Sequence, residues 1–339
     1  MTKEELIANF DPNGPAENDN IFGLPFAEEH AQIVILPVPW EVSVSYSAGT
    51  AHAPLAIKQA SAQVDLFDPA VEEAWKIGVW MAPIDEDLLN KSNLNRTLAE
   101  KYLESFDESL LPSLNAACAE MVNWVETQTT NYLDQNKFVA LLGGDHSTPM
   151  GYLKALAKRH DSFGILQIDA HADLRDAYEG FEYSHASIMY NALKIPQISK
   201  LVQVGIRDYC EEEKELIENG RGLITTFFDR DLKHQQYKGK TWAEQVSEIV
   251  SHLPELVYLS FDIDGLDPKL CPNTGTPVAG GFEAEEILFL IEKVIAAGKR
   301  IIGFDLNEVS PGEDEWDANV GARLLWRLCN LAGNSNQLQ

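Results

Sequence analysis

Short apolar runs alternate with longer stretches of helical character from about residue 32 to residue 332. The apolar runs predict strands at 31–39, 76–83, 137–142, 164–168, 200–206, 223–228, 256–261 and 300–308. The other stretches predict helices at 51–61, 94–135 with a break near Pro112, 148–159, 211–218, 242–253, 283–297 and 317–331, and a short helix that begins near His185. Strands that alternate with helices are typical of a parallel sheet covered by helices.

The chain of 339 residues shows no linker, repeat or low-complexity break, so we expect a single domain over residues 31–335. Residues 1–30 are polar and acidic, and we expect them to form an irregular N-terminal arm. No apolar run reaches the length of a membrane span, and the N-terminus lacks the apolar core of a signal peptide. The four cysteines are scattered and form no Cys-x-x-Cys pair, as in reduced proteins. We therefore expect a cytoplasmic protein.

The net charge is strongly negative, at −27, with 53 acidic against 26 basic residues. This charge argues against nucleic acids and anionic membranes as partners, because both would be repelled. It would attract a small cationic substrate. It is equally typical of a protein whose acidic surface serves solubility alone.

Three polar side chains follow the strand predicted at 164–168. Asp169, His171 and Asp173 alternate with small alanines, and alternate residues of an extended chain share one face. Two carboxylates and an imidazole that converge in this way are costly to bury unless a cation lies between them. The pattern therefore indicates a metal site.

Two further strand ends supply matching groups. Asp262 and Asp264 end the strand predicted at 256–261, and His146 follows the strand at 137–142 after two glycines. Four carboxylates among the six candidate ligands would balance two divalent cations. Oxygen and imidazole ligands without thiolate suit Mn²⁺ better than Fe, Co or Zn. Two such cations can bridge a water and lower its pKa, so the pattern favours a two-metal hydrolase.

With these motifs in place, the chain resembles the ureohydrolase family, which includes arginases, agmatinases and related guanidino- or formimino-hydrolases. The resemblance extends from about Val34 to Leu328 and is carried by Gly143-Gly-Asp-His-Ser147, Asp169-Ala-His-Ala-Asp173, Ser260-Phe-Asp-Ile-Asp-Gly-Leu-Asp-Pro268 and Asn307-Glu-Val-Ser-Pro311. It implies an α/β fold, a three-layer α/β/α sandwich around a mostly parallel eight-stranded sheet. It also implies assembly into a homotrimer or homohexamer.

The resemblance also implies a role for each matching residue. One Mn²⁺ would be held by His146, Asp169, Asp173 and Asp262, and a second by Asp169, His171, Asp262 and Asp264. Glu308 matches the guanidinium-binding glutamate of the family, and a carboxylate can accept two N–H bonds from a planar guanidinium. His185 matches the acid/base histidine. Asp173 would also accept a hydrogen bond from the attacking hydroxide.

The substrate tail is less clearly indicated. The run from Asp169 to Gly180 looks like agmatinases, whereas Gly205-Ile-Arg-Asp208 looks like arginases. Arg175 would repel a cationic substrate tail unless an acidic residue pairs with it. If it points into the site, it would instead favour a substrate that carries a carboxylate. Asp208 is a second candidate for binding the tail. We expect hydrolysis of agmatine to putrescine and urea. The alternatives are an arginase, guanidinobutyrase, formiminoglutamase or guanidine hydrolase, or a non-catalytic metal-binding relative.

Overall fold

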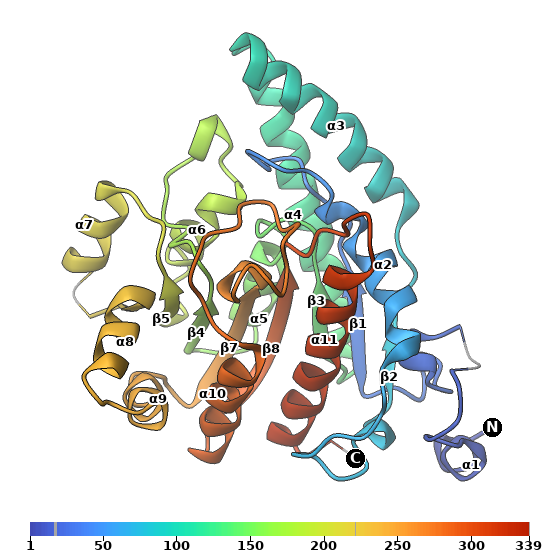
Figure 1. Cartoon of the computed structure of the whole chain (residues 1–339). Helices are drawn as coiled ribbons and strands as arrows, with labels where there is room; N and C mark the ends of the chain where they lie inside the picture. The colour runs from blue at the N-terminus through green and yellow to red at the C-terminus, as the bar shows by residue number, and fades with distance from the viewer. Residues whose placement is uncertain (17–18, 221, 339) are drawn as a thin grey trace.

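A single parallel sheet of eight strands lies at the centre of the computed structural model, which describes residues 1–16, 19–220 and 222–338 (Figure 1). The strands are β1 (Ile33–Pro37), β2 (Val79–Met81), β3 (Phe138–Leu142), β4 (Phe163–Ile168), β5 (Ile198–Ile206), β6 (Ile224–Phe228), β7 (Leu256–Asp262) and β8 (Arg300–Asn307). They lie in the order β2-β1-β3-β8-β7-β4-β5-β6, and every pairing is parallel. The predicted α/β class and strand count are confirmed.

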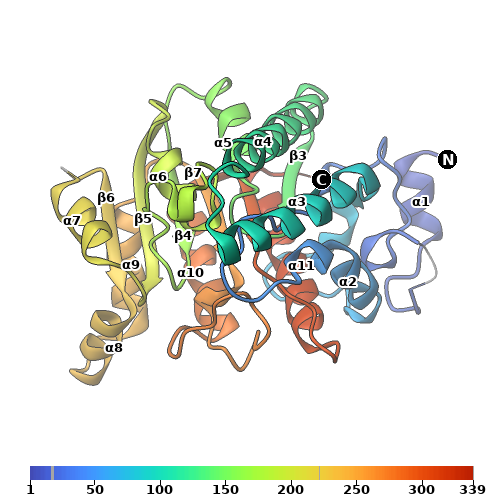
Figure 2. The same cartoon turned by 90° about the horizontal axis from the view of Figure 1, so that it is seen from above.

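Helices cover both faces of this sheet (Figure 2). They are α1 (Lys3–Asn9), α2 (Ala53–Ala60), α3 (Glu86–Ser105), α4 (Leu111–Asp134), α5 (Met150–Ala157), α6 (Ile188–Ala192), α7 (Glu211–Asn219), α8 (Asp229–Tyr237), α9 (Trp242–Ser251), α10 (Ala284–Ala296) and α11 (Trp316–Ser335). One apolar core contains side chains of α2, α9, α10 and α11, and the other contains side chains of α4, α5 and α6. Alternate residues of β3 enter the two cores, as the two-residue period of a strand requires.

The helical stretch predicted over 94–135 with a break near Pro112 forms two helices in the structure, separated by residues 106–110. α3 begins at Glu86, where the Asp85 side chain accepts a hydrogen bond from the Leu88 N–H at 2.9 Å, so this helix starts eight residues earlier than expected. It ends at Ser105, and the next residue, Phe106, has a left-handed φ of 54°. Pro112 lies just after this break, in the first turn of α4, because that position needs no backbone donor.

The N-terminal segment also differs from the expectation of an irregular arm. Residues Lys3–Asn9 form α1, whose start is capped by Thr2. Phe22, Leu24 and Phe26 are buried in the apolar core of their own chain.

Within the described residues, no helix combines the length and the apolar content that crossing a bilayer requires.

The strand order places the polar motifs together. β3, β8, β7 and β4 are neighbours in the sheet, and each of them is followed at its carboxyl end by one of the four motifs. β5 lies beside β4 and leads to Asp208. Ligands of open α/β sheets bind outside this edge, so the fold predicts a site there.

Candidate active site

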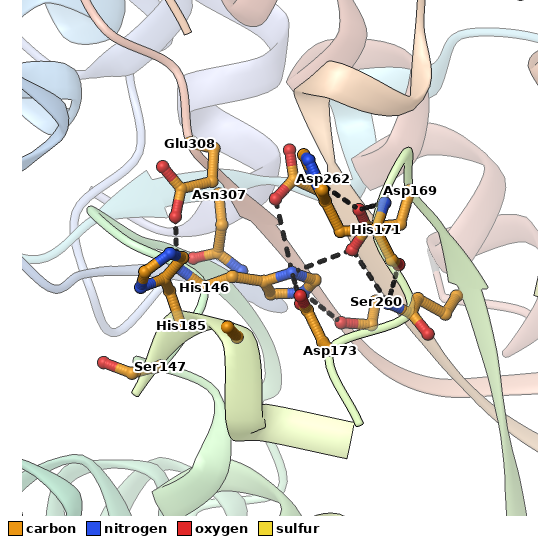
Figure 3. Close-up of polar contacts among 12 residues, drawn as sticks. His146, Ser147, Asp169, His171, Asp173, His185, Ser260, Asp262, Asn307 and Glu308 are labelled. Atoms are coloured by element: carbon orange, nitrogen blue, oxygen red, sulfur yellow. Dashed lines mark hydrogen bonds and ion pairs between the residues drawn. The ribbon is translucent and has the colours of Figure 1, made fainter. Parts of the chain in front are cut away.

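Six side chains predicted to bind metal meet at the carboxyl edge of the sheet (Figure 3). His146, Asp169 and Asp262 form one buried group whose ligand atoms lie within 4.8 Å of one another. Asp169, His171 and Asp264 form a second group by the same criterion. Asp169 therefore belongs to both groups, as a carboxylate shared between two ions would.

The His146 ring shows that the first group suits a cation. Its Nδ1 is buried without a hydrogen-bond partner in the described residues. This nitrogen lies 3.1 Å from an oxygen of Asp169, 3.0 Å from Asp173 and 3.3 Å from Asp262. The opposite nitrogen, Nε2, is 2.8 Å from the Ser260 hydroxyl, which in turn donates to Asp305 at 3.2 Å. A proton on Nε2 would leave the Nδ1 lone pair directed at the carboxylates, as in a metal ligand.

The charges of the site also require cations. Burial alone would lower the pKa of His146, yet the adjacent carboxylates of Asp169, Asp173 and Asp262 raise this pKa well above its ordinary value. Burial raises the pKa of Asp173 to about 7, and Asp169 adds to this by repulsion. No lysine or arginine of the described residues forms an ion pair with the four ligand carboxylates. Two divalent cations would supply the missing positive charge, so the donor set fits a binuclear site.

Two carboxylates of the site have a strained backbone. Asp173 has a φ of 55° and Glu308 a φ of 62°, in the left-handed region that non-glycine residues seldom adopt. The carbonyl of Asp173 accepts two N–H bonds from the start of α6, each at 3.1 Å. The carbonyl of Glu308 accepts the Thr274 hydroxyl at 2.8 Å. These contacts hold both side chains in place against the strain.

A cavity of about 450 Å³ opens beside the candidate metal ligands. It is lined by Ser45, Tyr46, His171, Asp173, Arg175, Tyr178, His185, Ala186, Asp208, Tyr209, Glu213, Thr276, Pro277 and Val278. His171, Asp173 and His185 therefore share the cavity with the two residues considered for the substrate tail, Arg175 and Asp208. The cavity is large enough for a small guanidino compound.

Glu308 lies deeper and is not among the described residues that line this cavity. It is 5% exposed, and one carboxylate oxygen accepts the His146 N–H at 2.7 Å. The other oxygen accepts no hydrogen bond from the described residues, so it is available to a donor. Burial and the nearby Asp145 raise the pKa of Glu308 well above its ordinary value. A bound cation would relieve this repulsion.

His185 is half-buried and lies against the rest of the site. Its backbone N–H donates to the Ser43 hydroxyl at 3.0 Å, and that hydroxyl donates to Asp145 at 3.0 Å. Burial, helped by the neighbouring His171 and His146, lowers the pKa of His185 to about 3. His185 is therefore neutral at neutral pH, and its side chain lines the cavity. The Asp145 carboxylate accepts the backbone N–H and the hydroxyl of both Ser43 and Ser147, and so orients the loop that carries His146.

Arg175 and Asp208 have different surroundings. Arg175 Nε lies 3.7 Å from the buried Glu213 carboxylate, and its guanidinium carbon is 4.9 Å from the centre of the Tyr178 ring. Asp208 is exposed, and its side chain has no hydrogen bond or ion pair with the described residues. Glu213 itself accepts the Leu174 N–H at 3.0 Å and the Cys210 N–H at 2.8 Å.

Three residues with clear structural roles here were not identified from the sequence. Ser260 contacts His146, and its position two residues before Asp262 on the same strand face was a usable signal. Arg207 donates to the carbonyls of Asp264, Leu266 and Val278 and so connects two loops beside the site. Glu213 is separated from the metal motifs by more than 35 residues, and only the fold brings it near.

Comparison with known proteins identifies relatives along nearly the whole chain. A sequence model described as the arginase family matches residues 31–330. The agmatinase of Neisseria meningitidis is 30% identical over 310 residues, covering 90% of this chain and 89% of its own. The N(1)-aminopropylagmatine ureohydrolase of Synechocystis sp. is 28% identical over 312 residues, or 91% of each chain. Among solved structures, the agmatine ureohydrolase of Thermoplasma volcanium has a TM-score of 0.72 at 22% identity, covering 98% of this chain and 99% of that one. This chain therefore belongs to the arginase family of ureohydrolases, whose members have binuclear metal sites, and is agmatinase-like.

Proposed function

We propose that this chain hydrolyses agmatine to putrescine and urea with two Mn²⁺ ions per subunit. The observation that carries the proposal is the pair of His/Asp groups that share Asp169 beside a cavity with an acidic wall. The 30% identity to agmatinases supports the choice of substrate. Manganese is favoured because the donors are carboxylate oxygens and imidazole nitrogens.

We assign the metals to two ligand sets. His146, Asp169, Asp173 and Asp262 would hold one ion, and Asp169, His171, Asp262 and Asp264 the other. When bound, two such ions lower the pKa of water and make hydroxide available near neutral pH.

The protein side chains then orient the guanidino group and move protons. Glu308 binds the guanidinium through its unoccupied oxygen, and its raised pKa falls as it gains this partner. Asp173 accepts a hydrogen bond from the attacking water. His185, which lines the cavity beside Asp173, assists in delivering the proton lost by the attacking water to the amine that leaves.

The charges of the cavity wall favour a cationic tail. Beyond the candidate metal ligands and His185, its charged lining residues are Arg175, Asp208 and Glu213, which leave a net charge of −1. Arg175 is next to Glu213, so its charge is largely matched. Asp208 remains without a partner in the described residues and is our candidate for binding the ammonium group of agmatine.

One observation favours a second candidate, a guanidino acid such as 4-guanidinobutyrate or arginine. The terminal nitrogens of Arg175 donate no hydrogen bond to the described residues, so they could donate to a carboxylate of the substrate.

The two candidates are separated by urea release from agmatine, L-arginine and 4-guanidinobutyrate, measured with Mn²⁺-loaded protein. We expect the highest kcat/KM for agmatine and a loss of that preference in Asp208→Asn. A higher kcat/KM for either acid would show that the tail is a carboxylate bound by Arg175. We also infer a homotrimer or homohexamer from the resemblance to ureohydrolases, which analytical ultracentrifugation tests.

A further inference from the structure

The outer wall of the active-site cavity carries a small set of opposed charges, which we call the outer charge cluster: Arg175, Asp208 and Glu213. Their side chains differ in how firmly neighbouring groups hold them. The Glu213 side chain is 4% exposed, and each of its oxygens accepts a backbone N–H. The Arg175 side chain is 39% exposed and is held by the Glu213 charge and the Tyr178 ring. The cluster therefore combines one immobile anion with a cation that partly faces the cavity.

The net charge of the cluster determines how many positive charges on a substrate tail the cavity can balance. With all three groups ionised the cluster has a net charge of −1, which matches one ammonium group. Without Arg175 the same wall would carry −2, because Glu213 would keep its charge and lose its counter-ion. A second ammonium on a longer tail would then find a second anion.

We propose that Arg175 is a specificity-determining residue that limits the pocket to substrate tails with one positive charge. This inference rests on the proposed function, since it assumes that a guanidino substrate places its tail in this cavity. Agmatine has one tail ammonium, whereas N(1)-aminopropylagmatine has two amines in its tail. Arg175 neutralises Glu213, so the cluster keeps only the charge of Asp208 and has no second free anion for the second amine.

The test compares kcat/KM for the two substrates within each protein, so that any shared loss at the metal site cancels in their ratio. In Arg175→Gln the cluster changes from −1 to −2, and we expect the ratio of dicationic to monocationic substrate to rise about tenfold, as for a charge pair partly exposed to water. In Glu213→Gln the cluster becomes neutral, and this ratio should fall below that of the wild type. The double variant returns the cluster to −1 and should restore the wild-type ratio.

Two matched variants separate charge from shape. Arg175→Lys keeps the positive charge and should keep the wild-type ratio although the side chain changes. Arg159→Gln removes an arginine that is paired with Asp134 away from the cavity, and it should leave both kcat/KM values unchanged.

An unchanged ratio in Arg175→Gln would overturn the inference while leaving the proposed function intact. A ratio that rises equally in Arg175→Gln, Arg175→Lys and the double variant would also overturn it, because the cause would then be space rather than charge. If the wild type releases urea from neither substrate, the proposed function itself is wrong, and the inference falls with it.

Discussion

Asp169 is the residue on which both candidate metal positions depend. One oxygen accepts the His171 N–H at 2.6 Å, and the other lies 3.1 Å from His146 Nδ1. The histidine contacts lower the pKa of Asp169 below its ordinary value even though burial alone would raise it. It is thus ionised in this site and suited to lie between two cations.

Replacing Asp169 should abolish the site without unfolding the chain. In Asp169→Asn we expect loss of at least one metal and a fall in kcat of about 10²–10³, typical for removal of one electrostatic group from an active site. Metal content by mass spectrometry and urea release measure the two effects. Asp161→Asn, at an exposed position before β4, should behave as wild type. Full activity with two bound metals in Asp169→Asn would disprove the shared-ligand assignment.

Ser260 tests the orientation of His146. Ser260→Ala removes the hydroxyl that lies 2.8 Å from Nε2, so the ring loses the partner that fixes its proton. We expect Mn²⁺ affinity to fall about 10–100-fold with little change in the folded structure. Calorimetric titration of the metal-free protein gives the affinity, and the exposed Ser251→Ala is the control. Equal affinities for both variants would mean that Ser260 does not position the ligand.

At the scale of elements, close backbone approach explains the two glycines before His146. A Cβ on Gly144 would lie 1.9 Å from the Trp40 carbonyl oxygen, and one on Gly143 would lie 1.7 Å from the Asn307 side chain. The loop after β3 therefore packs directly on the residues that follow β1 and on the end of β8. Any side chain at Gly144 must push the loop that carries His146 away from its neighbours.

Gly144→Ala should consequently lose stability and metal binding together. The contact is with backbone, which cannot move aside cheaply, so we expect a loss of about 1–3 kcal/mol, the usual range for overpacking. Urea denaturation in the presence of Mn²⁺ measures it. Gly14→Ala meets only ordinary contacts of 3.4 Å or more and should change little. A Gly144→Ala protein as stable as Gly14→Ala would contradict the close approach.

Elements with a clear pattern of apolar and polar residues were predictable from the sequence. Elements whose position depends on contacts with distant segments were not. The buried strands β3, β4 and β7 and their polar ends follow from apolar runs that stop at Asp or His. α8 was missed because Leu232 is its only buried apolar side chain, so it has no helical periodicity to detect. Pro112 indicated the break between α3 and α4, but its exact position depends on the left-handed Phe106, which no local signal marks. Glu213 and Arg207 reach the site from distant segments, so only the fold reveals their roles.

At the scale of the whole molecule, the clustered carboxylates make stability depend on pH and metal together. The pKa of Asp173 is raised to about 7, so the folded chain holds a proton that the unfolded chain releases near pH 4. The raised pKa of Asp173 therefore lowers the free energy of unfolding of the metal-free protein by about 1.4 kcal/mol for each unit that the pH rises between these values. The raised pKa of His146 acts in the same direction, because the stability from its protonated form is lost as pH rises through the folded-state pKa.

We therefore expect the Tm of metal-free protein to fall from pH 5 to pH 8, and the stabilisation by Mn²⁺ to grow over the same range. Thermal unfolding with EDTA or with Mn²⁺ measures both. Asp173→Asn removes the titrating group, so its metal-free form should lose less Tm between the two pH values. An identical pH slope in the variant and the wild type would rule out Asp173 as a source of the effect.

The central claim is that two metals at one shared site make this chain a ureohydrolase. Titrating metal-free protein with Mn²⁺ while following urea release from agmatine tests this claim most directly. The account predicts no urea without metal and a rate that saturates at about two ions per chain, as a two-metal site requires. Urea release by the metal-free protein, or saturation at a single ion, would contradict it.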